Sequence, residues 1–150
     1  MITVAISGGF DPVHKGHIKH IQEARKLGDK LVVLLNNDNW LLKKKGYVFM
    51  PQEERKLILE AITGVDEVII TSHPKNPEDM SICRELEKIR PGIFAKGGDR
   101  DEQNAADAAS SLNPERALCQ KLNIKLKFNV GGKKAQSSSE LVNRVHKISN

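Results

Sequence analysis

Short apolar runs alternate with segments of helical pattern along the first part of the chain. The runs at 4–6 and 31–35 are continuously apolar, which is typical of strands buried on both faces. Between them, apolar residues recur at helical spacing from Ile18 to Leu27, and Gly28 follows as a stop. The pattern therefore predicts a strand, a helix and a second strand, in that order.

The rest of the chain continues this alternation. An asparagine-rich cluster at 36–39 and the lysine-rich stretch up to Pro51 predict a long polar loop after the second strand. The elements expected beyond it are a helix at 52–63, a strand at 68–70, a loop at 72–77, a helix to about Arg90, a strand at 93–95, an alanine-rich helical tract interrupted by Pro114, a strand at 125–128 and a closing helix through Leu141, Val142 and Val145.

Strands that alternate with helices predict an α/β fold, because parallel strands need crossover connections. We expect one Rossmann-like domain over residues 1–150, with three layers and a parallel sheet of about five strands. In such sheets ligands bind beyond the carboxyl ends of the strands. The loops expected on that edge carry Gly8-Gly9-Phe10, the lysine run at 43–45, Gly97-Gly98-Asp99 and the triple serine at 137–139.

The composition excludes several classes of protein. Apolar residues make up 39% and charged residues 29%, which argues against disordered and fibrous chains. No stretch approaches the ~20 apolar residues of a membrane span, and the first residues lack the basic segment of a signal peptide. Cys83 and Cys119 stand far apart, which favours reduced thiols in the cytoplasm.

A net charge of +5 favours an anionic partner. Aromatic residues make up only 4%, so a surface for stacking the bases of a single strand is poorly supplied. We therefore expect a small anion as the partner, with neither nucleic acid nor membrane.

The most specific motif runs from Gly8 to His17 and reads Gly-Gly-Phe-Asp-Pro-Val-His-Lys-Gly-His. Its glycines let the backbone approach a ligand closely. His14 and His17 are three residues apart where a helix begins, so both rings can point to one side, near the free N–H groups of the first turn. Gly16 between them leaves room for a nucleotide, and together these features predict a phosphate-binding site.

A metal site is the alternative interpretation of these histidines, because His20 continues the spacing of His14 and His17. No acidic or cysteine residue is placed to complete such a site, and the flanking Gly-Gly-Phe-Asp-Pro favours phosphate binding instead.

Other polar groups have two interpretations each. The lysine run at 43–45 is either a solvated run of charge or a phosphate contact. Arg55 opens a helix, where an arginine mildly opposes the dipole, and a phosphate contact would explain that placement. The triple serine is a good N-cap, and the same geometry offers hydroxyls and N–H groups to phosphate. Asp11 is either a magnesium ligand or an acceptor for the loop backbone, and the sequence leaves both open.

These segments resemble the nucleotidyltransferase superfamily that bears the His-x-Gly-His signature. The similarity is greatest to its small bacterial members, glycerol-3-phosphate cytidylyltransferase and the heptose phosphate adenylyltransferase domain. The matching segments cover most of the chain: the signature loop at 8–18, a helix end at 24–29, a helix and strand at 54–62 and 65–69, Lys-Gly-Gly-Asp at 96–99 and the triple serine.

The resemblance implies that a phosphate oxygen of an acceptor attacks the α-phosphorus of a nucleoside triphosphate in line, and that pyrophosphate leaves. It implies catalytic roles for His14, His17, Lys44 and Arg55. The nucleotide-binding residues that it implies are Gly8, Gly9, Phe10, Gly16, Lys45, Gly97, Asp99, Ser137, Ser138 and Ser139. It further implies Mg²⁺ with the triphosphate, Asp11 as its candidate ligand, and a homodimer.

The substrate is less closely defined. The Gly-Gly-Asp element at 97–99 favours a heptose-phosphate-type adenylyltransferase. A glycerol-3-phosphate-type cytidylyltransferase is the alternative, although the Arg-Thr-Glu-Gly-Ile segment of those enzymes is replaced here at 131–136. The segment 101–116 follows neither pattern and is a place for acceptor contacts. Two further classes stay open: a nucleotide-binding regulator without turnover, and a nucleic-acid-binding domain that rests only on the net charge.

Overall fold

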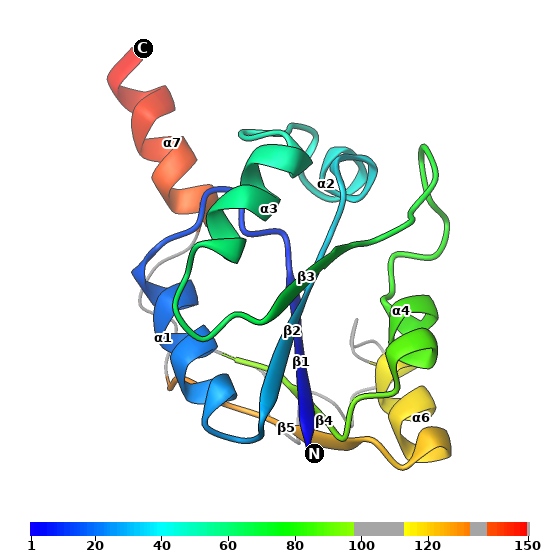
Figure 1. Cartoon of the computed structure of the whole chain (residues 1–150). Coiled ribbons are helices and arrows are strands. Elements are labelled where there is room, and N and C mark those ends of the chain that lie inside the picture. The colour runs from blue at the N-terminus through cyan, green and yellow to red at the C-terminus, as the bar shows by residue number, and fades with distance from the viewer. Residues whose placement is uncertain (98–112, 133–137, 150) are drawn as a thin grey trace.

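Five parallel strands form one sheet in the order β3-β2-β1-β4-β5 (Figure 1). The computed structural model describes residues 1–97, 113–132 and 138–149. The strands are β1 Thr3–Gly8, β2 Lys30–Leu35, β3 Glu67–Ile70, β4 Ile93–Ala95 and β5 Lys125–Lys127. Every neighbouring pair is parallel, which confirms the expected α/β sheet.

Helices cover both faces of this sheet. They are α1 Lys15–Arg25, α2 Asp38–Lys45, α3 Gln52–Glu60, α4 Cys83–Ile89, α6 Asn113–Leu122 and α7 Ser138–Ser149. Figure 1 shows α1 and α3 on one side of the sheet and α4 and α6 on the other, while α7 projects near the carboxyl edge. The expected three layers are therefore confirmed.

Alternate residues of each central strand enter two separate cores. Val4 and Ile6 of β1 pack with Ile21 of α1 on one face of the sheet. Ala5, between them, packs on the other face with Leu86 of α4. The continuous apolar runs of the sequence therefore reflect burial on both faces of a parallel sheet.

The lysine-rich segment after β2 is a helix, not the loop expected from the sequence. The Asn37 side chain caps α2 by accepting a hydrogen bond from the backbone N–H of Trp40 at 2.9 Å. Gly46 ends the helix with a left-handed φ of 84°. The three lysines occupy the last turn, where the helix dipole favours cations. The helix has only eight residues, too few for a periodic pattern to identify it.

One other boundary differs from the pattern, and a second can be described on one side only. Helix α1 ends before Gly28, which does not act as a left-handed stop. The glycine is needed there for another reason: a Cβ at Gly28 would lie 2.7 Å from the backbone carbonyl oxygen of Ile2. Pro114 lies in the first turn of α6, where a proline is tolerated. The alanine-rich tract before it lies outside the described residues.

The strand ends bring three loops together. Gly8 of β1 pairs with Leu35 of β2, and Leu35 pairs with Ile70 of β3, so these strands end at one level. The strand order reverses between β1 and β4, which is where open α/β sheets bind ligands. Within the described part of the chain, no helix is long and apolar enough to cross a membrane.

Candidate functional site

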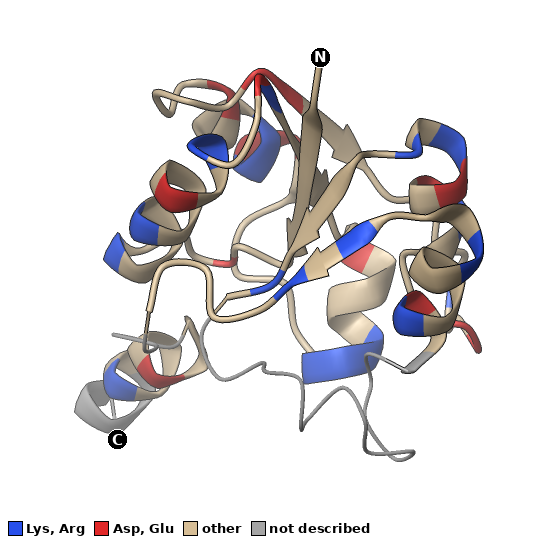
Figure 2. Cartoon of the chain, turned by 90° about the horizontal axis from the view of Figure 1, so that it is seen from below, with Lys and Arg blue, Asp and Glu red and all other residues tan. Residues whose placement is uncertain are grey.

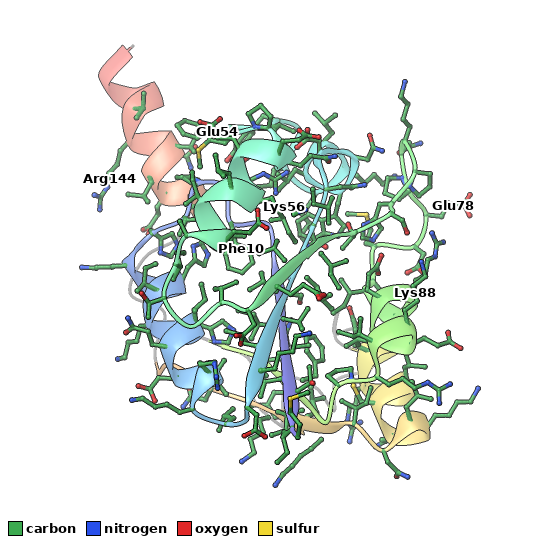
Figure 3. All side chains as sticks on the ribbon, in the orientation of Figure 1. Phe10, Glu54, Lys56, Glu78, Lys88 and Arg144 are labelled. Carbon is green, nitrogen blue, oxygen red and sulfur yellow. The ribbon has the colours of Figure 1, made fainter. Side chains whose placement is uncertain are left out.

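The loop after β1 folds back into the protein. Phe10 adopts a left-handed backbone with φ of 50° and is buried in the same core as Leu59 of α3 (Figure 3). A Cβ at Gly8 would lie 3.1 Å from the Phe10 ring, and a Cβ at Gly9 would lie 3.0 Å from Leu41, so a side chain at either position would crowd its neighbour. The peptide bond between Asp11 and Pro12 is cis.

Asp11 holds this loop to the segment before α3. Its carboxylate is fully buried and accepts 2.6 Å hydrogen bonds from the backbone N–H groups of Phe49 and Met50, one on each oxygen. Of the two interpretations left open by the sequence, the structure supports the backbone acceptor. Within the described ranges, no group of three or more His, Cys, Asp or Glu residues is placed to hold a metal ion.

The two signature histidines cap helix α1 with their own rings. Nδ1 of His14 accepts a 3.1 Å hydrogen bond from the backbone N–H of Gly16, and Nδ1 of His17 accepts one of 3.2 Å from the backbone N–H of His14. The rings stack with centroids 3.8 Å apart and planes inclined by 25°, and the edge of Phe10 contacts His17 at 4.8 Å. Both rings are thus brought together, as the spacing predicts.

This arrangement fixes the tautomers of the pair. Because both Nδ1 atoms accept hydrogen bonds, the proton of each neutral ring lies on Nε2. Nε2–H donors beside the first turn of a helix suit an anion with several oxygens, although Nε2 of His14 is buried in this conformation. The capping geometry also holds both rings in place before any ligand arrives.

Arg55 lies beneath this site, not on its surface. Its side chain has no accessible surface. Nη1 donates to the carbonyl oxygens of Gly9 and Asn36 at 2.7 Å each, Nε donates to the carbonyl of Met50 at 2.9 Å, and Nη2 pairs with Asp38 at 2.7 Å. A ligand cannot touch a side chain with no accessible surface, so in this conformation Arg55 acts on the site through the loops that it joins.

The lysines lie in the last turn of α2. Lys44 is exposed and Lys45 is half-buried, while Lys43 donates a 2.9 Å hydrogen bond to Asn76. Figure 2 shows other Lys and Arg residues spread over helices on both sides of the sheet, with Asp and Glu between them. Lys43 is exposed as well, but it is engaged with Asn76, which leaves Lys44 as the exposed lysine of this run for which no side-chain bond is seen among the described residues.

The glycine element after β4 meets α1 at His20. A Cβ at Gly97 would lie 2.8 Å from Nδ1 of His20, so the strand end and the helix touch through the bare glycine. The same Nδ1 donates to the carbonyl of Val130 at 2.7 Å. Burial lowers the pKa of His20, the hydrogen bond to Val130 opposes this, and the charge of Lys96 lowers the pKa further. Gly98 and Asp99 lie outside the described residues.

The serine run meets the signature loop. Ser138 begins α7, is buried, and donates its hydroxyl to the carbonyl of Pro12 at 2.8 Å. Ser139 is half-buried in the first turn of the same helix. Ser137 lies outside the described residues. The loop after β1 and the start of α7, more than a hundred residues apart in sequence, are thus side by side.

Sequence reasoning missed the role of the asparagines after β2. Asn36 is buried, and its Oδ1 accepts no hydrogen bond from the described residues. Asn37 bonds to the loop after β3, with its N–H on Thr71 and its side-chain N–H on the carbonyl of His73. The Asn-Asn-Asp-Asn cluster was the available signal, because several adjacent amide side chains after a buried strand can link neighbouring loops.

Comparison with known proteins supplies a context for this geometry. The sequence profile of the cytidylyltransferase-like family matches residues 5–142. The chain is 37% identical over 100 residues to an FAD synthase of Ferroglobus placidus, over 67% of this chain and 61% of that protein. It is 35% identical over 106 residues to the bifunctional protein HldE of Cronobacter sakazakii, over 69% of this chain and 21% of that protein. The matches thus span less than two thirds of each of these two relatives.

Solved structures agree on the fold. The lipopolysaccharide core biosynthesis protein of Thermoplasma volcanium superposes with a TM-score of 0.64 and 25% identity, covering 86% of this chain and 94% of that one. TmcAL of Thermotoga maritima, bound with alpha-thio ATP, superposes with a TM-score of 0.69 over 99% of this chain and 51% of that one. Its 12% identity is evidence of a shared fold alone.

Proposed function

The chain belongs to the cytidylyltransferase-like family, and we propose that it transfers a nucleotidyl group from a nucleoside triphosphate to a small phosphorylated sugar or alcohol. The observation that carries this proposal is the stacked pair of His14 and His17, which is held by the first turn of α1 at the carboxyl edge of the sheet. Fixed hydrogen-bond donors at a helix N-terminus can bind the negatively charged oxygens of a triphosphate.

The reaction needs no nucleophile from the protein. A phosphate oxygen of the acceptor forms a bond to the α-phosphorus while the bond from that phosphorus to the bridging oxygen breaks, and pyrophosphate leaves with the electron pair. Negative charge accumulates on the oxygens around the α-phosphorus in the transition state. The Nε2–H donors of His14 and His17 would stabilise that charge, once the ligand reaches the buried Nε2 of His14.

Other residues serve binding and position. Lys44, with Lys45 beside it, would attract and hold the phosphates from the end of α2. Gly16 lets the nucleotide approach the helix, and Ser138 supports the loop from α7. We propose that Arg55 is a positioning residue, because its donors hold the carbonyl oxygens of Gly9 and Asn36 on either side of the site.

A divalent ion would arrive on the triphosphate. Asp11 does not fit as its ligand, since both carboxylate oxygens are engaged with backbone N–H groups and the side chain is fully buried. Mg²⁺ commonly keeps several waters and is held largely by the phosphates of the substrate. We therefore derive no step from a protein-held metal.

The preferred donor is ATP and the preferred acceptor is a heptose-type sugar phosphate. The similarity to HldE and the Lys-Gly-Gly-Asp element at 96–99 support this choice. Transfer of a cytidylyl group to glycerol 3-phosphate is the alternative. A flavin phosphate, as the name of the FAD synthase relatives implies, is a third acceptor class.

The test is pyrophosphate release with each of ATP, CTP, GTP and UTP, combined with sugar phosphates, glycerol 3-phosphate and a flavin phosphate in the presence of Mg²⁺. We expect release with a single preferred pair. Stabilisation of the protein against heat by a triphosphate, without release for any pair, would instead indicate a nucleotide-binding regulator.

A further inference from the structure

His20 is the third histidine of α1, and its ring is used differently from those of His14 and His17. Its Nδ1 lies 2.7 Å from the carbonyl oxygen of Val130. Because a carbonyl can only accept a hydrogen bond, the proton of the neutral His20 ring lies on Nδ1, whereas the signature pair carries its protons on Nε2. The ring of His20 therefore holds the backbone of a segment 110 residues away in the sequence.

That segment is the loop that leads from β5 to α7. Its Val130 N–H donates to the carbonyl of Lys96 at 2.9 Å, so the loop is tied to the end of β4 as well as to His20. Gly131 follows with a φ of 97°, and a Cβ there would lie 2.9 Å from Cα of His20. The loop therefore lies directly against the backbone of α1, and Figure 1 shows the chain after β5, in orange, passing beside this helix.

The end of β4 meets the same ring. A Cβ at Gly97 would lie 2.8 Å from Nδ1 of His20 and 3.1 Å from its Cγ and Cε1, so the ring packs on bare backbone. The ammonium of the preceding Lys96 donates to the hydroxyl of Ser7 at 3.4 Å, which links this strand end to β1. His20 is thus the point at which α1, the end of β4 and the loop before α7 are in contact.

The loop before α7 has a second tie to the site. Where α7 begins, the hydroxyl of Ser138 donates to the carbonyl of Pro12 at 2.8 Å. Pro12 precedes the signature pair, and His20 follows it, about 9 Å along α1 from His14 at the usual helical rise of ~1.5 Å per residue. The two ties therefore lie on either side of the histidine pair, and together they fix where the chain enters α7.

Fixing this loop in advance has a consequence for affinity. Asn129, Gly131 and Gly132 all have positive φ, and the two glycines adopt negative φ as readily, so the loop has other conformations available once it is released. The entropy of ordering the loop again would then oppose the binding of any ligand that needs the arrangement seen here. A side chain that holds the loop in place removes this cost.

We propose that His20 is a positioning residue for the triphosphate. Its Nδ1–H and its ring hold the loop before α7 and the end of β4 against α1, in the arrangement that binds the phosphates. The proposal rests on the function proposed above. It gives His20 a role in that function through these two segments, and not by contact with a substrate.

Two substitutions separate the hydrogen bond from the bulk of the side chain. His20→Leu removes the donor and keeps a side chain of similar size, whereas His20→Asn places an amide N–H as many bonds from the backbone as Nδ1. Calorimetry with Mg²⁺ and a triphosphate whose α–β bridge cannot be cleaved measures binding without turnover. We expect Kd to rise about tenfold in His20→Leu and to stay within about threefold of the unaltered protein in His20→Asn.

Arg25→Leu is the matched control. Arg25 lies at the other end of α1, and its Nη1 donates to the carbonyl of Gly28 at 2.7 Å, so this substitution also removes a side-chain bond to a backbone carbonyl. Urea unfolding should show that both leucine variants are folded but less stable, and only His20→Leu should bind the triphosphate more weakly. Unaltered affinity in His20→Leu, or an equal loss of affinity in Arg25→Leu, would overturn the proposal.

Gly131→Ala tests the same contact from the side of the loop. Its Cβ would collide with the backbone of α1, so the loop must move while the histidine stays. Kd should rise by about as much as in His20→Leu, and the double variant should lose little more, since both changes act on one contact. Should His20→Leu not fold, Gly131→Ala and His20→Asn decide: normal affinity in Gly131→Ala would overturn the proposal.

Turnover separates this proposal from the proposed function. Where pyrophosphate is released, His20→Leu should raise KM for the triphosphate and leave kcat and the KM of the acceptor nearly unchanged, because nucleotide binding is weakened equally in the ground and transition states. A lower kcat with an unchanged KM would overturn the positioning role while the transfer activity stands. Weaker triphosphate binding in His20→Leu, in a protein that releases no pyrophosphate, would support the positioning role and contradict the transfer activity. An unaltered protein that binds no triphosphate would contradict both.

Discussion

The guanidinium of Arg55 lies 2.7 Å from the carboxylate of Asp38, and the arginine side chain is wholly buried. This pair joins the start of α3 to the first turn of α2. The same guanidinium also holds the carbonyls of Gly9 and Asn36, so the loops after β1 and β2 share one anchor. The geometry of the site therefore depends on a residue that has no accessible surface in this conformation.

Arg55→Ala should lower the free energy of unfolding by about 3–5 kcal/mol, because it leaves buried carbonyl oxygens and the Asp38 carboxylate without their donor. Arg55→Lys should recover only part of this loss, since an ammonium cannot reach four acceptors in the geometry of a guanidinium. Urea unfolding measures both. Glu54→Gln, at an exposed neighbour on α3, is the control and should unfold like the unaltered protein. A stable Arg55→Ala variant would contradict the anchoring role.

Two substitutions can remove the imidazoles of the signature pair while keeping the cap of α1. His14→Asn retains a favourable N-cap residue, and His17→Gln retains the reciprocal capping bond. Each should leave thermal stability nearly unchanged and lower kcat by roughly 10²–10³, because each removes one of the donors that we propose for the α-phosphate. Steady-state pyrophosphate release together with a melting curve tests this. Full turnover in His17→Gln would contradict the mechanism.

The alternation of apolar runs and helical segments was sufficient to predict the sheet and its three layers. Both signals are local: a strand buried on two faces is continuously apolar, and a covering helix repeats at 3.6 residues. Helix α2 was not predicted, because its stability comes from the Asn37 cap and the left-handed Gly46 at its two ends and not from an apolar stripe.

The candidate site was predictable where spacing alone determines geometry. His14 and His17 must share a side of the helix because they are three residues apart. The burial of Arg55 was not predictable, because it depends on the carbonyls of Gly9 and Asn36, in two loops distant in sequence, as well as on that of Met50 just before α3. The fixed shape of the loop after β3 was missed for the same reason: Ser72 to Pro77 has the composition of an ordinary loop, and its shape comes from Asn37 and Asn39 on another loop.

Lys44→Ala should raise KM for the triphosphate several-fold and affect kcat less, because an exposed ammonium at the end of α2 attracts phosphates mainly by charge. The effect should shrink as salt is added, since the Debye length is only about 10 Å at 0.1 M. Lys26→Ala is the matched control: it removes the same charge from the end of α1, where Lys26 pairs with Glu23. Equal changes in both variants would mean that overall charge, not position, attracts the nucleotide.

His20 should make stability depend on pH. Its pKa is lowered from the ordinary 6.5, chiefly by burial and also by the charge of Lys96, against the opposing hydrogen bond to Val130. Between the lowered pKa and 6.5 the unfolded chain binds more protons than the folded one, so the free energy of unfolding falls as the pH falls through this window. His20→Gln keeps a donor for the Val130 carbonyl and does not titrate. Urea unfolding of both proteins from about pH 7.5 to about pH 5.5 should show a steeper loss of stability in the unaltered protein. All other histidines are common to both proteins, so parallel curves would show that the folded state of His20 accepts its proton at no cost.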